Sequence, residues 1–448
     1  MADDSRTWLG WICWKGEEMD RIDDLEFPTL AVVGIGRVGL PLAISFADAG
    51  LNVVGLDRNA DHVATVNSGV LPFVEHGAQP ILDRVLESGA FRASTDPQDA
   101  ISPADVVIVT VGTPLNTDLR ADTTQVESAL AEIAPYLKAG VLIVMRSTLS
   151  PGTTERTVTP SLERLTGYKA GVDLFVAFCP ERIAEGQAIE ELRTLPEIIG
   201  ETDPVGGDRA ERLFRFLNKD KTIQRTDSLS AELAKLFTNV YRYVNFALAN
   251  EYALIAEHYE RDAHHIISTL REDYPRAPVP MPGPAGGPCL SKDGYFLIEE
   301  LTFPDFVLTA WKLNDSVPAH IVHRLTSELR RRGTSPNGAK VAVLGTAFKG
   351  DIDDDRQSPS LRVIEVLKRS GYEVAIHDPY LAPGNVEDVL CDAVGVVLAT
   401  NHSEYRLLDA EALARVVSEG CVIADAWDVL DADEWERHGV SVLTFGRG

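Results

Sequence analysis

Apolar residues are spaced in two different ways along this chain. Short unbroken runs that are rich in β-branched side chains and bounded by polar turns predict buried strands. In the first part of the chain these runs are 30–33, 52–56, 105–111 and 141–145. Between them, apolar residues that return every three or four positions predict helices at about 40–49 and 124–137. Strands alternating with helices are typical of a parallel sheet with helices on both faces, so we expect an α/β domain here.

The pattern changes near Leu213. From about 229 to 261 the apolar spacing is helical throughout, which predicts one long central helix. Such a helix often packs against a symmetry mate, so it is a candidate dimerisation element. Another helix is predicted at 319–332, and the turn-rich segment 334–338 predicts a linker.

The last part of the chain repeats the order of strand and helix seen in the first. A strand beginning at Lys340, a helix near 360–369 and a strand at 373–377 predict a second α/β domain. The expected segments are therefore an extension outside the fold at 1–28, a first α/β domain at 29–212, a helical domain at 213–333 and a second α/β domain at 334–448.

The extension combines Trp8, Trp11 and Trp14 with a following acidic stretch. It has neither the basic start nor the continuous apolar stretch of a signal peptide. One hypothesis is that translation begins at Met19, a few residues before the first predicted strand.

A glycine-rich loop, Gly34-Ile35-Gly36-Arg37-Val38-Gly39, joins the first predicted strand to the first helix. The first glycine permits a tight turn, the second lets a diphosphate approach the backbone, and the third lets the helix pack closely on the strand. Asp57 ends the second strand, where a carboxylate accepts hydrogen bonds from ribose hydroxyls, which favours NAD over NADP. Neighbouring Arg58 keeps NADP open, and a glycine turn without a ligand is the structural alternative. Gly112 and Thr113 end another strand, and we expect them at the same edge.

Charge and cysteine content narrow the class of protein. The 42 Lys and Arg against 68 Asp and Glu give a net charge of −26, which disfavours nucleic acid as a partner and confines any phosphate site to a local pocket. No apolar run approaches the roughly 20 residues that a membrane helix needs. The five cysteines are scattered and form no CxxC pair, so we expect no disulfide framework, no zinc site and a reducing cytoplasm.

Several segments carry reactive side chains. In Gly286-Gly287-Pro288-Cys289, a cysteine after a glycine turn is open to close approach by a substrate, and Lys292 or a helix N-terminus is expected to lower its pKa. On the long helix, Lys235 and Asn239 share one face. The other segments are Glu181-Arg182 with Glu185, and Lys349 with Arg356 after a strand of the second domain, where phosphates are often bound.

Each of these segments alone also fits an ordinary structural role. Cys289 is then a loop cysteine, and Glu181 with Glu185 belongs to a solvated turn. Glu232 and Lys235 form an i,i+3 surface pair, and the segment around Lys349 is a charged loop.

Together and in this order, the motifs closely resemble the UDP-glucose/GDP-mannose dehydrogenase family over roughly residues 29–445. The resemblance rests on the glycine loop, Arg146-Ser147-Thr148 with Pro151 to Thr154, Pro180-Glu181-Arg182, Ala231 to Lys235, Gly286 to Asp293, and Phe348-Lys349 to Ser358-Pro359. It implies two Rossmann-like doubly wound domains joined by a long central helix and a helical dimerisation domain. It also implies an NAD cofactor, a UDP-sugar substrate bound by the C-terminal domain, and a homodimer or higher homo-oligomer.

The resemblance further implies a four-electron oxidation of a sugar C6 alcohol to a carboxylate, with Cys289 passing through a thiohemiacetal and a thioester. Lys235 would stabilise oxyanions, and Asp293 would orient water or exchange protons. Glu181 would assist thioester hydrolysis, and Thr148 and Glu185 would lie near the water and the nicotinamide. The residues expected at the substrate are Glu181, Arg182, Lys235, Asn239, Arg242, Arg276, Gly286, Gly287, Phe348, Lys349 and Arg356. One of Arg276, Lys349 and Arg356 is a candidate to reach across a subunit interface.

The substrate is narrowed by smaller likenesses. Pro180 to Arg182, Arg242 to Asn245 and Tyr274 to Arg276 resemble the branch acting on UDP-N-acetylhexosamines, with UDP-N-acetylmannosamine first and UDP-N-acetylglucosamine second. The cysteine loop departs from that branch, because Pro288 replaces its frequent His and Lys292-Asp293 resembles the form in UDP-glucose enzymes, so UDP-glucose and UDP-galactose stay open. A role in surface polysaccharide synthesis is implied by the resemblance alone.

Two other classes of protein compete with this interpretation. A two-electron β-hydroxyacid dehydrogenase would need neither Cys289 nor a second α/β domain. A non-catalytic NAD sensor or scaffold should lack the set of Lys235, Cys289 and Asp293.

Overall fold

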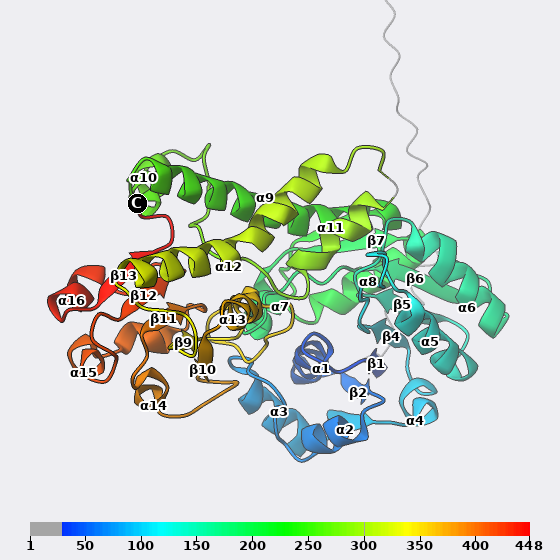
Figure 1. Cartoon of the computed structure of the whole chain (residues 1–448). Helices are drawn as coiled ribbons and strands as arrows, with labels where there is room; N and C mark the ends of the chain where they lie inside the picture. The colour runs from blue at the N-terminus through cyan, green and yellow to red at the C-terminus, as the bar shows by residue number, and fades with distance from the viewer. Residues whose placement is uncertain (1–28, 300) are drawn as a thin grey trace, which may run out of the picture.

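The computed structural model of the chain describes residues 29–299 and 301–448 (Figure 1). The expected extension at 1–28 and the hypothesis of a start at Met19 lie outside these residues. Two parallel-sheet domains stand at the two sides of the molecule, and long helices run across both (Figure 1). The predicted fold class is confirmed.

The first domain is built on an eight-stranded sheet with the order β3-β2-β1-β4-β5-β6-β7-β8. All neighbours are parallel except β6 and β7, which are antiparallel. The strands are β1 (Thr29–Val33), β2 (Asn52–Leu56), β3 (Phe91–Ser94), β4 (Val106–Val109), β5 (Val141–Met145), β6 (Leu174–Phe178), β7 (Glu197–Glu201) and β8 (Ile223–Asp227). The reversal of strand order between β2 and β4 at β1 places a ligand crevice at the carboxyl end of β1.

Helices cover both faces of this sheet. They are α1 (Gly39–Asp48), α2 (Ala60–Asn67), α3 (Ala78–Glu87), α4 (Pro97–Ile101), α5 (Thr124–Ile133), α6 (Thr159–Thr166), α7 (Ala188–Thr194) and α8 (Pro204–Arg215). Along β1, Leu30 and Val32 pack into the core on one face, and Ala31 and Val33 pack into the core on the other. Burial on both faces explains why the strands are continuous apolar runs in the sequence.

Several predicted boundaries shift for local reasons. The strands at 52–56 and 141–145 have the predicted bounds, but β4 ends at Val109 because Thr110 and Val111 turn out of the sheet to line a cavity. The helix predicted at 124–137 ends at Ile133 and tightens into a 3₁₀ turn that contains Pro135.

The middle of the chain is helical. It comprises α9 (Ser228–His258), α10 (Ala263–Arg271), α11 (Leu290–Ile298) and α12 (Asp305–Arg331). Asp227 caps α9 by accepting the N–H of Ser230 at 2.8 Å. The helix predicted at 319–332 is wrong at its start, because α12 begins at Asp305 and passes through the buried Pro318. None of the helices in the described ranges is long and apolar enough to span a membrane.

The second domain has a five-stranded parallel sheet with the order β10-β9-β11-β12-β13. Its elements are β9 (Lys340–Leu344), α13 (Pro359–Arg369), β10 (Glu373–His377), α14 (Val386–Leu390), β11 (Gly395–Leu398), α15 (Ala410–Ala414), β12 (Val422–Asp425), α16 (Ala432–Arg437) and β13 (Ser441–Thr444). The first sheet continues to Asp227, past the boundary predicted at 212, because β8 pairs with β7. The division into three domains otherwise stays a prediction.

Candidate active site

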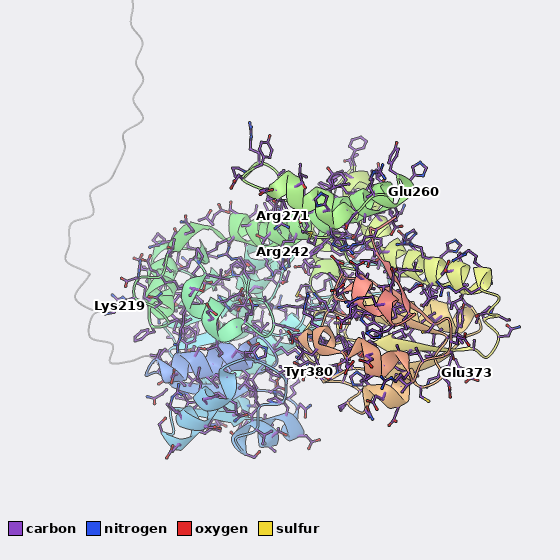
Figure 2. The ribbon with its side chains drawn as sticks, turned by 90° about the vertical axis from the view of Figure 1, so that its left-hand side faces the viewer. Lys219, Arg242, Glu260, Arg271, Glu373 and Tyr380 are labelled. Carbon is purple, nitrogen blue, oxygen red and sulfur yellow. The ribbon has the colours of Figure 1, made fainter. Side chains whose placement is uncertain are left out.

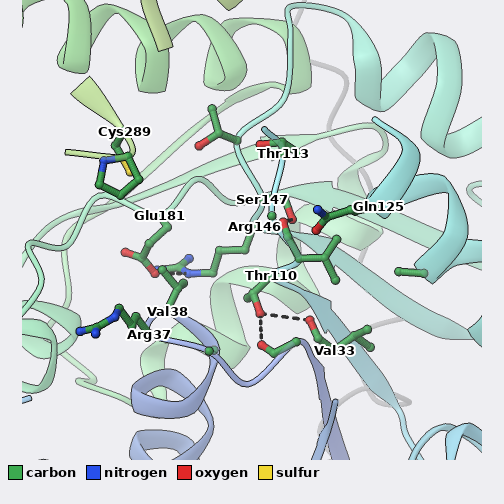
Figure 3. Close-up of a pocket in the computed structure, with 18 of the residues that line it drawn as sticks. Val33, Arg37, Val38, Thr110, Thr113, Gln125, Arg146, Ser147, Glu181 and Cys289 are labelled. Atoms are coloured by element: carbon green, nitrogen blue, oxygen red, sulfur yellow. Dashed lines mark hydrogen bonds and ion pairs between the residues drawn. The ribbon is translucent and has the colours of Figure 1, made fainter. Parts of the chain in front are cut away.

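A cavity of about 490 Å³ opens at the carboxyl edge of the first sheet and extends to the loop that carries Cys289. Figure 3 shows Thr110, hydrogen-bonded to Val33, at one end and Cys289 above Glu181 at the other. Of the predicted site residues, the cavity is lined by Gly34, Gly36, Arg37, Val38, Gly39, Asp57, Arg58, Gly112, Thr113, Thr148, Glu181, Glu185, Lys235, Cys289 and Arg356. One continuous cavity therefore joins the dinucleotide loop to the reactive cysteine.

The three glycines of the loop have the separate roles that the sequence predicts. Gly34 adopts a φ of +87°, which favours glycine and makes the turn. A Cβ on Gly39 would overlap the carbonyl oxygen of Gly34, so only glycine allows this packing of α1 on β1. A Cβ on Gly36 would meet nothing within 4 Å, because that position faces the open cavity. A diphosphate can therefore approach the backbone and the N-terminus of α1.

Asp57 stands where a ribose would lie. Its carboxylate accepts the N–H of Ile35 at 3.1 Å and the N–H of Asn59 at 3.0 Å, which aims it along the loop. Ile35 itself is fully buried and serves the site only through its backbone. The guanidinium of Arg58, the cation that left NADP as an alternative, lies 3.5 Å from Glu132 and donates to Ser128. It therefore already has partners within the protein.

The Cys289 loop is held against the second domain by its two glycines. The N–H of Gly287 donates to the carbonyl of Gln357 at 3.0 Å. A Cβ on Gly286 would collide with Pro359, and one on Gly287 would collide with Phe348. Gly286, Gly287 and Phe348 thus position the cysteine loop, and none of them lines the cavity.

Cys289 precedes α11 as its N-terminal cap residue, and its side chain faces the cavity. Desolvation by the surrounding walls raises the pKa of the thiol above its ordinary value, and Asp293 and Glu185 raise it further. Lys235 and Lys292 act in the opposite direction. Lys292 therefore lowers this pKa, as predicted, but desolvation outweighs it and the net shift is upward.

The face of α9 turned toward the cavity is polar. Lys235 is 7% exposed, and within the described part of the chain its ammonium forms no hydrogen bond or salt bridge. One turn later, Asn239 donates to Asp293 at 2.6 Å. Glu232 is fully buried and accepts from the backbone of Gly152 and from Thr154, so the alternative of a Glu232–Lys235 surface pair is wrong.

Glu181 belongs to a buried ion cluster behind the cavity. Arg146 donates to Glu181 at 2.7 Å and to Glu197 at 2.9 Å, and the backbone N–H groups of Arg182 and Ile183 bind the second oxygen of Glu181. Burial raises the pKa of Glu181. Arg146 and these N–H groups together lower the pKa by more than burial raises it, so the net shift is downward. The sequence analysis names Arg146 only as part of a motif and does not identify Glu197. Nothing in the sequence around Glu197 distinguishes it from an ordinary exposed glutamate.

Glu185 meets the second domain at the rim of the cavity. Arg356 lies 3.4 Å from its carboxylate, and Lys349 donates to its backbone carbonyl at 3.0 Å. Desolvation and the neighbouring Asp354 raise the pKa of Glu185 to about 7, against the opposing charges of Arg37 and Arg356. One oxygen of Glu185 is buried and has no hydrogen-bond partner.

Three arginines predicted to bind the substrate lie outside this cavity. Arg182 donates to the carbonyl of Pro196 on the far side of the Glu181 loop. Arg242 is exposed on α9 (Figure 2), and exposed Arg276 stacks over the ring of Tyr274 at 4.9 Å. A single subunit does not bring these arginines to Cys289.

The second domain repeats the glycine turn of the first domain, but the aspartate after its second strand is buried. Gly345 has a φ of +89° and donates to the carbonyl of His377, as Gly34 does to Leu56. The aspartate that follows β10, Asp378, is fully buried and accepts N–H groups of Thr346, Ala347, Tyr380 and Leu381. Of these two aspartates, Asp57 lines the cavity described above, whereas Asp378 is fully buried by its backbone partners.

The fold and this site define an NAD-dependent oxidoreductase. The chain belongs to the UDP-glucose/GDP-mannose dehydrogenase family: the family's NAD binding domain matches residues 28–218, its central domain 229–316 and its UDP binding domain 342–432. It is a nucleotide-sugar dehydrogenase, which confirms the predicted cofactor and enzyme class and sets aside the two competing classes of protein.

Relatives span nearly the whole chain. UDP-N-acetyl-D-mannosamine dehydrogenase of Pyrococcus horikoshii is 36% identical over 88% of this chain and 94% of its own. A solved structure of the UDP-D-ManNAc dehydrogenase from that organism has a TM-score of 0.88 at 34% identity, covering 94% of this chain and 99% of the other. A UDP-glucose dehydrogenase from Pyrobaculum islandicum has a TM-score of 0.81 at 27% identity, covering 94% and 98%.

Proposed function

We propose that this enzyme oxidises the C6 alcohol of UDP-N-acetylmannosamine to the carboxylate, with Cys289 as covalent catalyst. The observation that carries the proposal is the single cavity in which the dinucleotide loop, Lys235 and Cys289 meet. The open face at Gly36 and the carboxylate of Asp57 fit NAD, which supplies a hydride acceptor when bound.

In the proposed reaction, loss of a hydride from C6 and of the proton from its hydroxyl first gives an aldehyde. The sulfur of Cys289 adds to that carbon, and a second hydride leaves the resulting thiohemiacetal, so that C6 becomes a thioester. A water oxygen then replaces the sulfur, which releases the acid and returns the thiol. Cysteine suits both steps because its sulfur is a strong nucleophile and also a good leaving group.

The charged groups around the sulfur have distinct proposed roles. Lys235, buried and without an ion partner among the described residues, is free to stabilise the oxyanion that forms at each addition. Asp293, fixed by Asn239 and Lys292, exchanges protons with water or the substrate hydroxyl. Thr148 and Glu181 line the same cavity and have proposed roles at the hydrolytic water.

The positions of two basic side chains support a substrate that lies between the two domains. Lys349 and Arg356 lie at the rim that the second domain contributes, where a sugar diphosphate would pass. The N-acetylmannosamine configuration is supported by the names of relatives in Pyrococcus horikoshii and Methanococcus aeolicus. The NDP-N-acetyl-D-galactosaminuronic acid dehydrogenase of Ralstonia nicotianae, 32% identical, is the reason to test other N-acetylhexosamines. The acidic sugar product suits a building block of surface polysaccharides.

We further propose that the enzyme is a homodimer formed through α9. Large apolar side chains lie exposed along this helix and at its C-cap: Phe237, Tyr241, Leu248, Tyr252 and Ile255, with Tyr259 as the cap residue. A stripe of this kind on an otherwise acidic protein is suited to a symmetry mate. Arg276, outside its own cavity, is then the candidate to reach the partner's cavity. A cytoplasmic location is part of the proposal, since the described cysteines are all free.

The test is a panel of UDP-N-acetylmannosamine, UDP-N-acetylglucosamine, UDP-N-acetylgalactosamine and UDP-glucose, compared by kcat/KM for NADH formation. The proposal predicts the highest value for UDP-N-acetylmannosamine, by about tenfold or more, since one mismatched polar group in a built site costs at least this much. A higher value for UDP-glucose would overturn the substrate assignment and leave the cysteine chemistry standing.

A further inference from the structure

The side chain of Arg37 leaves the dinucleotide loop and binds the second domain. Its Nη1 donates to Oδ1 of Asp353 at 2.7 Å, and its Nη2 donates to the backbone carbonyl of Asp353 at 2.8 Å. Its Nε lies 3.6 Å from Asp354, and its guanidinium stacks over Phe73 at 5.2 Å. Two-pronged contacts of this kind fix a guanidinium in orientation as well as position.

The segment that holds Arg37 also touches the rest of the active site. Oδ1 of Asp353 accepts the N–H of Val74 at 3.1 Å, next to the stacked Phe73. Further along, Arg356 and Lys349 bind Glu185, and the carbonyl of Gln357 accepts from the cysteine loop. Residues 349–357 thus connect the glycine loop, the Glu185 loop and the Cys289 loop.

This arrangement gives the glycine loop two tasks. Its backbone and Gly36 face the cavity, where the diphosphate of NAD belongs, while the Arg37 guanidinium is engaged by acidic groups of the second domain. Arg356, which lines the NAD cavity, comes from that same second domain. Both ligands therefore meet groups that are in place only when the two domains are joined.

We propose that Arg37 and Asp353 form an interdomain clasp that couples the binding of NAD to the binding of the nucleotide sugar. The two are positioning residues, because neither has to touch the reacting atoms. A ligand that favours the clasped arrangement lowers the cost of closing the domains for the second ligand, and by linkage the effect is mutual. The inference rests on the family assignment and not on which sugar is used.

The test measures the dissociation constant of NAD by calorimetry, with and without saturating UDP, on the full chain. The variants are Arg37→Gln, Asp353→Asn and the double variant. Arg37→Lys keeps the charge but cannot form the two-pronged contact. Asp355→Asn is the matched control, since in the described ranges the Asp355 side chain makes no hydrogen bond or ion pair.

In the parent and in Asp355→Asn, saturating UDP should lower the dissociation constant of NAD by about fivefold or more, a typical size for coupling between two sites. In both single variants, in the double variant and in Arg37→Lys, UDP should change the dissociation constant of NAD by less than twofold. The double variant should be no worse than either single variant, because both changes open the same contact.

Two results would overturn the clasp. If Arg37 instead binds the NAD diphosphate directly, Arg37→Gln weakens NAD equally with and without UDP, and Asp353→Asn leaves the coupling intact. A parent in which UDP does not change NAD affinity also excludes it. Because no sugar is turned over, failure here is distinct from failure of the proposed substrate or chemistry.

Discussion

The side-chain amide of Asn239 donates a 2.6 Å hydrogen bond to Oδ2 of Asp293, between two helices that reach the active site from different parts of the chain. Asp293 is fully buried on α11, four residues after Cys289, and Asn239 is one turn after Lys235 on α9. The other oxygen of Asp293 pairs with Lys292 at 3.0 Å. This bond ties the lysine helix to the cysteine helix and fixes the orientation of the carboxylate.

Asp293→Asn should keep the shape of this contact and remove its charge. We expect kcat to fall by about 100-fold, the size of a lost general acid or base, with KM for NAD within threefold of the parent. Steady-state kinetics measures both. Asp305→Asn, at the exposed start of α12, is the control. A kcat within threefold of the parent would remove Asp293 from proton transfer.

Lys235→Met should remove the ammonium group from the cavity while keeping a side chain of similar length. A lost oxyanion donor costs about 100- to 1,000-fold in kcat, and we expect a loss in this range with NAD affinity unchanged. Lys312→Met, exposed on α12, controls for the loss of a lysine. Full activity of Lys235→Met would show that another group stabilises the oxyanion.

Arg146→Met should destabilise the fold more than an ordinary loss of an ion pair. It leaves Glu181 and Glu197 buried without their shared cation, and breaking such a cluster costs about 3–5 kcal/mol. The free energy of unfolding in urea is the measurement. Arg193→Met breaks a half-exposed pair with Asp48 and should cost about 1 kcal/mol or less. Equal losses in the two variants would contradict the structural role of the cluster.

The raised pKa of Glu185 should make the free energy of unfolding depend on pH. Its pKa is raised from 4.5 to about 7, so the folded state holds the proton more tightly than the unfolded chain. The stability it contributes is present below pH 4.5 and is lost as the pH rises toward 7, by roughly 2–3 kcal/mol. Unfolding measured from pH 4.5 to 7.5 should therefore show a smaller decline for Glu185→Gln than for the parent. The exposed Glu190→Gln should keep the decline of the parent, and an unchanged slope in Glu185→Gln would refute the raised pKa.

Much of the fold follows from local sequence rules. The strand at 52–56, the glycine loop and the long α9 were predictable because buried parallel strands, tight turns and helical spacing each leave a pattern in consecutive residues. The start of α12 was not, because Pro318 ordinarily marks a helix boundary and only the surrounding packing shows that it is tolerated here.

The site residues divide in the same way. Cys289, Lys235 and Asp57 stand in motifs whose spacing carries the chemistry, and all three line the cavity. The partner of Arg37 was beyond local reasoning, since Asp353 lies 316 residues away in another domain. The net rise in the pKa of Cys289 was beyond local reasoning for a related reason: the effect of Lys292 was foreseen from the sequence, but the desolvation that outweighs it depends on the fold.

The most direct measurement is the yield of NADH per nucleotide sugar consumed, for the parent and for Cys289→Ser. The proposed chemistry predicts two NADH for each UDP-N-acetylmannosamine in the parent, together with one equivalent of the uronic acid. Cys289→Ser should form no uronic acid at an appreciable rate, because the serine hydroxyl is a poorer nucleophile and the sulfur that forms the thioester is gone. One NADH per sugar in the parent, or unchanged uronate formation by Cys289→Ser, would contradict the covalent four-electron mechanism.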